Sequence, residues 1–450
     1  MMSVITIQVG QCGNQIGGQL FQTLIDDVNI KQSQTLVSPF KNEEYKEEVL
    51  NRFFTYDTTS SELPKARAVM VDMEPKVIAQ TCANAQKSGK WLYPEKQQFC
   101  QQKGSGNNWA HGYCVHGPVA QENVMELVQR EAEKCDNVSG FLSLLSLAGG
   151  TGSGVGAFIS KCVRDEFPHA FILNQVVWPY HTGEVIVQNY NAVLTLSHLY
   201  RTADALVVME NDSLHKICSQ LMNIKKISFK DINKVICHQL ASFLQPAPLE
   251  KFPDFTIQNT LGEIMDHMVS HPDYKLLTVK NIPHMSEKSI EFSTFQWHGL
   301  LKHLRQMLIA GASMEEGIDW QIQVGTETPR GSTSHYRSLA NLLILRGKEV
   351  NTADTSAFTD PNIYTPWMPT GGTLLQGRQP RSFYQYEKSA VLLSNSRSTI
   401  GPLNTMIGKA WNMFSSRAYV HQYTKHGLAE EDFVDSFVTL EQVISNYSKL

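Results

Sequence analysis

The residues best suited to chemistry form a glycine-rich segment in the first half of the chain. Ala148-Gly149-Gly150-Thr151-Gly152-Ser153-Gly154 directly follows the apolar run 141–147 and precedes a helical pattern. Glycine lets backbone N–H groups approach an anion closely, and the N-terminus of the following helix adds a favourable partial charge. The Thr and Ser hydroxyls supply further donors. The pattern predicts a phosphate-binding loop; the alternative is a glycine-rich turn without a ligand.

The spacing of the glycines leaves the kind of phosphate ligand open. A Walker loop needs Gly-x4-Gly-Lys-Ser/Thr, and no lysine follows these glycines, which argues against an ordinary P-loop NTPase. Gly152-x-Gly154-x-x-Ala157 fits a relaxed dinucleotide fingerprint. That segment lies far from the first expected strand, and no strand-terminal acid follows at the spacing that would hold a ribose. A dehydrogenase is therefore disfavoured.

Three polar loops elsewhere are candidates for the same edge of a sheet. They are Gly10-Gln11-Cys12-Gly13-Asn14-Gln15, Asp72-Met73-Glu74-Pro75 and Gly104-Ser105-Gly106-Asn107-Asn108. Together they supply amides for phosphate oxygens and carboxylates for hydrated Mg²⁺, which prefers few protein oxygens plus phosphates. Each loop alone is also compatible with a simple turn, and the acid pair with a solvated turn.

Histidine and cysteine raise the alternative of a zinc site at His111, Cys114 and His116. Tetrahedral zinc sites usually show paired, recognisable spacing, which is missing here, so zinc is disfavoured. The eight cysteines contain no CxxC pair. Reduced thiols are therefore a better interpretation than a disulfide framework.

Alternating strand and helix patterns must position these loops. The expected strands are Val4–Val9, Ala66–Asp72, Phe141–Leu147 and Ala205–Met209, and the expected helices between them include Gln121–Lys134 and Gly156–Glu166. This alternation predicts an α/β fold with a mostly parallel sheet covered by helices, whose strand ends meet in one ligand site.

The remainder of the chain predicts further domains. A helix is expected at Phe229–Phe243, and prolines 246, 248 and 253 end it. Two more helices are expected at Gly401–Arg417 and Ala429–Tyr447, packed on the body of the protein. We predict a nucleotide-binding domain at 1–227, a core helix at 228–247, a second domain at 255–390 and a C-terminal helical domain at 391–450.

Composition excludes several partner classes. The 450 residues carry a formal net charge of -4, so no global basic field exists to hold nucleic acid or an anionic membrane. The N-terminus alternates like a strand and lacks the long apolar run of a signal peptide, and no apolar segment is long enough to span a bilayer. We expect a cytoplasmic protein without a nucleic-acid or membrane partner.

Four segments resemble the motifs of tubulins. GQCGNQIG, VDMEPKVI, GSGNNWAHG and AGGTGSG stand in tubulin order and spacing, and the resemblance covers nearly the whole chain. The stretches 178–191 and 281–286 are most similar to the delta subfamily. The resemblance implies a tubulin-like fold with an N-terminal Rossmann-like GTPase domain, a core helix, an α+β second domain and C-terminal helices.

The resemblance also implies the ligand, GTP or GDP with Mg²⁺, and a role for each matching residue. The implied nucleotide contacts are Gln11, Cys12, Asn107, Ser146, Ala148, Gly149, Gly150, Thr151, Gly152, Ser153, Gly154, Glu184, Asn211, Phe229 and Asn233, and the implied metal-site residues are Glu74 and Asp72.

Within this set, Asn211 and Asn233 would read the guanine edge and Phe229 would stack on the base, since an amide offers both a donor and an acceptor. Without the resemblance, Asn233 is a polar helix residue and Phe229 a core residue. Ala148 replaces the commoner glycine. Glu184 and Gln188 depart from the usual ribose-contact residues, which leaves the ribose contacts open.

The resemblance finally implies an assembly mechanism and a cellular role. Glu263 matches the acid that one subunit inserts against the nucleotide of its neighbour, where a carboxylate can polarise the attacking water. The alternative is an ordinary exposed helical glutamate. We expect other tubulins and centriolar proteins as partners, and a structural role in centrioles, basal bodies and cilia. A GTP-binding switch that acts on a non-tubulin partner is the alternative function.

Overall fold

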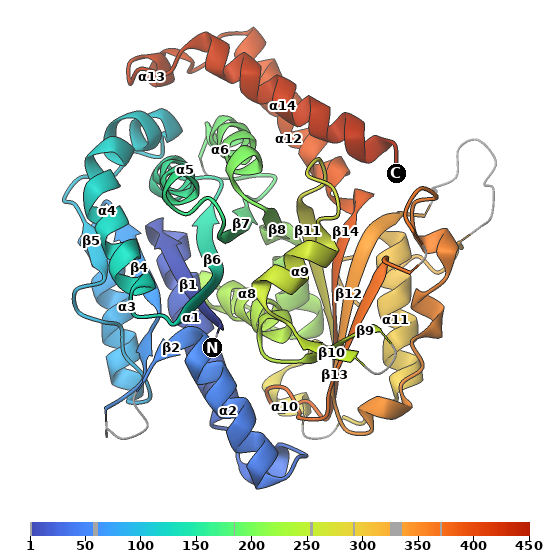
Figure 1. Cartoon of the computed structure of the whole chain (residues 1–450). Coiled ribbons are helices and arrows are strands. Elements are labelled where there is room, and N and C mark those ends of the chain that lie inside the picture. Colours follow the sequence, from blue (N-terminus) through green and yellow to red (C-terminus); the bar gives the residue numbers. More distant parts are fainter. Residues whose placement is uncertain are drawn as a thin grey trace. The chain divides into compact units, whose positions relative to one another are not determined.

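The computed structural model describes residues 2–56, 62–183, 185–252, 255–290, 293–324, 335–369 and 371–450 (Figure 1). The chain forms two compact units, each assembled from separate segments. Unit 1 comprises Met1–Gln22, Leu50–Asp212 and Ile400–Asn446, and unit 2 comprises Thr23–Val49, Ser213–Thr399 and Tyr447–Leu450. The four predicted domain boundaries stay a prediction.

Unit 1 contains a parallel sheet with the strand order β8-β7-β6-β1-β4-β5. Its strands are β1 (Met2–Val9), β4 (Ala68–Asp72), β5 (Gln98–Cys100), β6 (Asn137–Ser146), β7 (Phe171–Trp178) and β8 (Ala205–Glu210). The central strands are buried almost throughout, as expected for parallel strands covered on both faces, and this explains their apolar sequences. The predicted α/β class with a mostly parallel sheet is confirmed.

The helices between these strands follow the predicted pattern. They are α1 (Gly10–Val28), α3 (Pro75–Ser88), α4 (Gly117–Ala132), α5 (Gly156–Glu166) and α6 (Gln188–Thr202), and a small hairpin pairs β2 (Phe54–Thr55) with β3 (Lys65–Ala66). Helix α5 has the predicted bounds. Helix α4 begins four residues earlier than predicted, because Pro118 is compatible with the first helical turn, where its missing N–H costs nothing.

The order of the strands creates a switch point in the sheet. The chain goes from β1 to its neighbour β4 on one side, and later to β6 on the other side of β1. The loops that follow β1 and β6 therefore leave the same carboxyl edge in opposite directions. Open α/β sheets bind ligands in the crevice that this reversal produces.

Unit 2 contains a mixed sheet with the order β10-β9-β13-β12-β14-β11. Its strands are β9 (Pro248–Phe252), β10 (Phe255–Gln258), β11 (Leu276–Ile282), β12 (Ser338–Gly347), β13 (Leu374–Gln379) and β14 (Lys388–Ser396). Its helices and those that extend into it include α2 (Pro39–Phe53), α7 (Asn211–Lys216), α8 (Phe229–Leu244), α9 (Leu261–Met268), α10 (Glu287–Ile290) and α11 (Trp297–Ala310). Leu304 of α11 packs in one buried cluster with Leu343 of β12 and Leu392 of β14.

Helix α8 confirms the predicted helix at this position. It starts with a capping box in which Ser228 and Asp231 satisfy each other's backbone N–H groups. At the other end, the buried Arg346 guanidinium donates to the carbonyl oxygens of Ser242, Gln245 and Pro246. The bond to Ser242 satisfies a carbonyl of the last helical turn, and the other two bonds hold the residues that follow α8.

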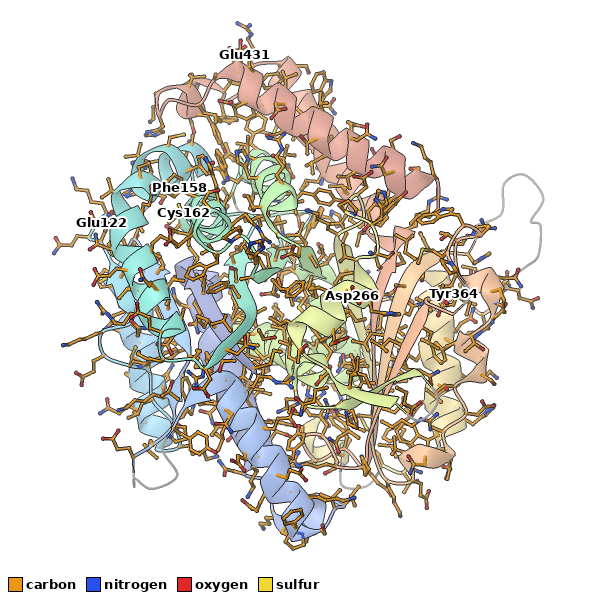
Figure 2. All side chains as sticks on the ribbon, in the orientation of Figure 1. Glu122, Phe158, Cys162, Asp266, Tyr364 and Glu431 are labelled. Carbon is orange, nitrogen blue, oxygen red and sulfur yellow. The ribbon has the colours of Figure 1, made fainter. Side chains whose placement is uncertain are left out.

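The C-terminal helices of unit 1 are α12 (Ile400–Ser415), α13 (His421–Thr424) and α14 (Glu430–Ser448). Helix α12 packs on α6, and Trp411 meets Phe437 of α14 edge to face, which confirms the prediction of helices packed on the body. Figure 2 shows Glu431 pointing away from the start of α14, where acidic residues favour the helix dipole. Within the described residues, no helix is long and apolar enough to cross a membrane.

Candidate nucleotide-binding site

The segment 10–15, predicted to be a loop, is instead the start of helix α1, which follows β1 without a break, and it meets the glycine-rich loop at the switch point of unit 1. Gly10 has φ +72°, a left-handed conformation, and a Cβ built on it would lie 2.8 Å from the backbone nitrogen of Gly152. Only glycine fits where two backbones approach so closely. The contact brings Gln11 and Cys12 to the loop that follows β6. Burial raises the pKa of the Cys12 thiol to about 12, so this cysteine is a neutral thiol and not a nucleophile.

The glycine-rich loop is fixed by its own hydroxyl groups. Ser153 is fully buried and its Oγ donates to the carbonyl oxygen of Gly149, while Oγ of Ser146 accepts from the backbone N–H of Ala148 at 3.2 Å. A π-helical turn, Thr151–Val155, then leads into α5. Such turns are frequent at functional sites. The two serines thus shape the loop that is predicted to hold phosphate.

The loop at 104–108 packs against the glycine-rich loop. The hydroxyls of Ser105 and Thr151 lie 3.1 Å apart. Asn107 has φ +53°, a conformation that asparagine tolerates better than most residues, and its side chain is exposed. Asn108 Oδ1 accepts from the N–H of His111 and so starts the following helical segment. The structure therefore brings Asn107 beside the loop predicted to hold phosphate.

Two acids lie at the end of β4. Asp72 is buried, and burial raises the pKa of its carboxyl to about 6, although the N–H groups of Met73 and Glu74 oppose that shift. The neighbouring carboxylate of Glu74 is exposed and reaches the loop at Gly104, where a built Cβ would lie 2.5 Å from its Oε1. Two neighbouring carboxyls of this kind fit a positively charged ligand, which would offset their mutual repulsion.

This acid pair is too small for a closed metal site. No group of three or more His, Cys, Asp or Glu in the described part of the chain could hold a metal ion. Mg²⁺ needs no such group, because it keeps several waters and takes its other oxygens from phosphates. The donor set of Asp72 and Glu74 beside a phosphate-type loop therefore fits Mg²⁺ better than zinc.

The predicted base-reading residues lie in both units. Asn211 begins α7 directly after β8 in unit 1, and its neighbour Asp212 accepts from the N–H of His181 at 2.9 Å. Phe229 and Asn233 belong to unit 2 and lie four residues apart on α8, which puts them on the same helix face. Phe229 is 63% exposed, far more than a core residue would be. Glu184 lies outside the described residues.

Glu263 lies in the first turn of α9, in unit 2. Thr260 caps this helix and accepts from the N–H of Glu263 at 3.3 Å. Leu261, Ile264 and Met265 are buried, whereas Glu263 is half-buried on another side of the helix. Asp266, labelled in Figure 2, is exposed on the same helix.

Comparison with known proteins assigns the family. The Tubulin/FtsZ family, GTPase domain, matches residues 3–219. The tubulin delta chain of Macaca fascicularis is 52% identical over 457 residues, which span all of both chains. The chain belongs to the tubulin family. The tubulin delta chain of Homo sapiens is also 52% identical over both full lengths, and the tubulin beta-2 chain of Emericella nidulans is 26% identical over this whole chain and 94% of its own.

The match to the tubulin GTPase domain covers the loops of unit 1 and ends before Phe229, Asn233 and Glu263. The delta-chain relatives extend over these three positions as well. The resemblance to tubulins of the delta subfamily, read from the motifs, is confirmed. The role of each individual site residue stays a prediction.

Two buried asparagines hold the segments of the site together through hydrogen bonds that the sequence did not predict. Asn14 is buried and its Nδ2 donates to the carbonyl oxygens of Gly10 and Val71, so it ties the ends of β1 and β4 together. Asn191 on α6 makes similar bonds to two other loops. Inside a helical pattern an asparagine is typical of a solvated face, so spacing alone could not find either one.

Proposed function

We propose that this tubulin binds GTP or GDP together with Mg²⁺ at the carboxyl edge of the unit 1 sheet. The observation that carries the proposal is the convergence of three loops at the switch point, with Gly10 against Gly152 and Ser105 against Thr151. Backbone N–H groups of the glycine-rich loop would hold the phosphates, with the side-chain amides of Gln11 and Asn107 beside them. Asp72 and Glu74 would hold the magnesium ion through its waters.

The guanine end of the proposed site uses different chemistry. Asn211 and Asn233 would read the edge of the base, and the exposed ring of Phe229 would stack on it. Bound Mg²⁺ supplies charge neutralisation of the phosphate oxygens. Asp72 and Glu74 would hold and orient the ion. Because Asp72 is buried, its carboxyl has little access to bulk water.

Hydrolysis in this proposal needs two subunits. Glu263, half-buried on α9, would act on the nucleotide of a neighbouring subunit by orienting water, because a carboxylate accepts a proton or a hydrogen bond from the attacking water. The catalytic site is then complete only at a longitudinal contact with another tubulin.

We infer a structural role in the microtubule cytoskeleton, in forming or maintaining the triplet microtubules of centrioles and basal bodies and in assembling cilia. The 52% identity to tubulin delta chains over the full length supports this role, and centriolar proteins are then expected partners in the cytoplasm. The alternative is a GTP-binding switch that does not polymerise.

Sedimentation of the purified chain with alpha/beta-tubulin, in GTP and in GDP, separates the two functions. Nucleotide-dependent recovery in the polymer pellet supports the structural role. Nucleotide binding without any recovery in the pellet at any tubulin concentration contradicts it and leaves the switch.

A further inference from the structure

The side chain of Asn191 lies at the junction of three segments of unit 1. Its Nδ2 donates to the carbonyl oxygens of Asn107 at 2.8 Å and Ala148 at 2.7 Å. Its Oδ1 accepts from the N–H of Trp109 at 3.0 Å and from the hydroxyl of Tyr423 at 2.6 Å. An amide has two donors and two acceptor positions, so every hydrogen-bonding capacity of this side chain is used.

The burial of Asn191 makes these bonds hard to replace. The residue is 0% exposed, so water cannot take over a lost bond, and a buried carbonyl left without a donor costs free energy. One amide group therefore fixes the separation between the loop carrying Asn107 and the glycine-rich loop at Ala148. Both loops belong to the proposed nucleotide site.

The C-terminal helical segment holds the amide from the other side. Tyr423 on α13 is fully buried, and burial raises the pKa of its hydroxyl well above 10, so the hydroxyl stays protonated as a donor. A second bond joins the same segments, because Nδ2 of Asn108 donates to the carbonyl oxygen of Gln422 at 3.0 Å. Helix α13 is thus connected to the loop at 104–108 by hydrogen bonds in two ways, directly through Asn108 and indirectly through Asn191.

We propose that Asn191 is a positioning residue that sets the spacing of the two phosphate-facing loops, and that Tyr423 anchors it from α13. This inference rests on the proposed function, since guanine nucleotide is the ligand that the spacing serves. Nucleotide that draws Asn107 and the glycine-rich loop into one geometry must also order Tyr423 and α13. By reciprocity, the factor by which bound nucleotide favours the ordered state of α13 equals the factor by which ordering of α13 strengthens nucleotide binding, so loosening α13 must weaken that binding.

Tyr423→Phe tests the anchor, because it removes one hydroxyl and keeps the ring. Tyr190→Phe is the matched control: Tyr190 is also fully buried on α6 and its ring packs edge to face on Tyr423, but its hydroxyl donates to the C-terminal segment at Ala418 O and not to Asn191. The full-length variants are titrated with a fluorescent GDP analogue and Mg²⁺, and their thermal unfolding is recorded. Asn191→Asp, which turns both donors into acceptors, is the severe variant.

The two tyrosine variants should lower the melting temperature by similar amounts, because each loses one buried hydrogen bond. Only Tyr423→Phe should weaken GDP binding, by about 5-fold, the equivalent of one net hydrogen bond. Asn191→Asp should weaken it further if the variant folds. Equal affinity in Tyr423→Phe, Tyr190→Phe and the wild type would overturn the proposal.

Hydrogen exchange without nucleotide keeps this test separate from the proposed function. Amides of 104–109 and 148–154 should exchange faster in Tyr423→Phe than in Tyr190→Phe. If the wild type binds no guanine nucleotide but this difference is present, the proposed function fails and the positioning role of Asn191 stands. If the two variants exchange alike, the positioning role fails whatever the wild type binds.

Discussion

The contact between Gly10 and Gly152 gives the sharpest prediction about the site. Alanine at position 10 must adopt the left-handed conformation, which costs about 1–2 kcal/mol. Its Cβ would also lie 2.8 Å from a backbone nitrogen, which cannot rotate away, so relief of the overlap costs about a further 1–3 kcal/mol. The lower entropy of the unfolded alanine chain offsets about 0.4–1 kcal/mol. The free energy of unfolding should fall by about 1–5 kcal/mol in Gly10→Ala.

Gly89→Ala is the matched control for this strain. Gly89 has a similar φ of +66° at the end of α3, but a Cβ there would meet nothing within 4 Å. It should destabilise the protein by at most about 1.6 kcal/mol, since strain and unfolded-state entropy partly cancel. The difference between the two variants isolates the contact between the loops.

Nucleotide binding must push the separated loops back together in Gly10→Ala. If the overlap costs about 1–3 kcal/mol, affinity for GDP with Mg²⁺ should fall by about 5- to 150-fold, while Gly89→Ala binds like the wild type. Thermal unfolding and titration of a fluorescent GDP analogue measure both quantities. The reasoning is refuted if Gly10→Ala and Gly89→Ala unfold and bind alike.

Four further predictions concern the base, the metal site and the neighbour's nucleotide. Phe229→Ala should weaken GDP binding by about 1–3 kcal/mol with little change in melting temperature. Phe40→Ala, which removes another exposed ring, is the control. If a competition titration finds that the two variants bind GDP equally well, base stacking by Phe229 is contradicted. The raised pKa of Asp72 means that the folded state binds its proton more tightly, so this group should add stability as pH falls from about 7 to 4, and Asp72→Asn should abolish that gain in melting experiments at graded pH. In the wild type, Mg²⁺ should strengthen GDP binding less and less as pH falls over the same range, because a protonated Asp72 no longer attracts the ion. If the effect of Mg²⁺ on GDP binding does not change with pH, Asp72 does not belong to the metal site. Glu263→Gln should leave GDP affinity unchanged but slow GTP turnover in co-assembly with alpha/beta-tubulin by about 10²-fold, and unchanged turnover removes Glu263 from the mechanism.

Local sequence patterns predicted the elements well because each pattern carries its own physics. Helix α5 begins where the glycines end and its buried stripe has helical spacing, so both ends could be predicted. The glycine-rich loop could be predicted because its glycines follow one another in the sequence, between a strand pattern and a helix pattern. Phe229 differs, since an isolated phenylalanine in a helix pattern is typical of the core, and only the resemblance to tubulins predicted a surface role for it.

Long-range hydrogen bonds explain what the sequence could not predict. Asn191 meets Asn107, Ala148 and Tyr423 at separations of 84, 43 and 232 residues. No periodicity links such positions, because the contact exists only after the sheet and the C-terminal helices have formed. The sequence therefore predicted the residues within the loops, but not the distant residues Asn191 and Tyr423 that connect one loop to another.

The central claim is that the switch-point loops of unit 1 hold a guanine nucleotide. Its most direct test is to identify and count the nucleotide released on denaturing the purified full-length protein, and to titrate nucleotide-free folded protein with GDP, GTP and ATP in the presence of Mg²⁺. We predict one GTP or GDP per chain, displaced by guanine nucleotides and not by ATP. Folded protein with no affinity for either guanine nucleotide would contradict the account.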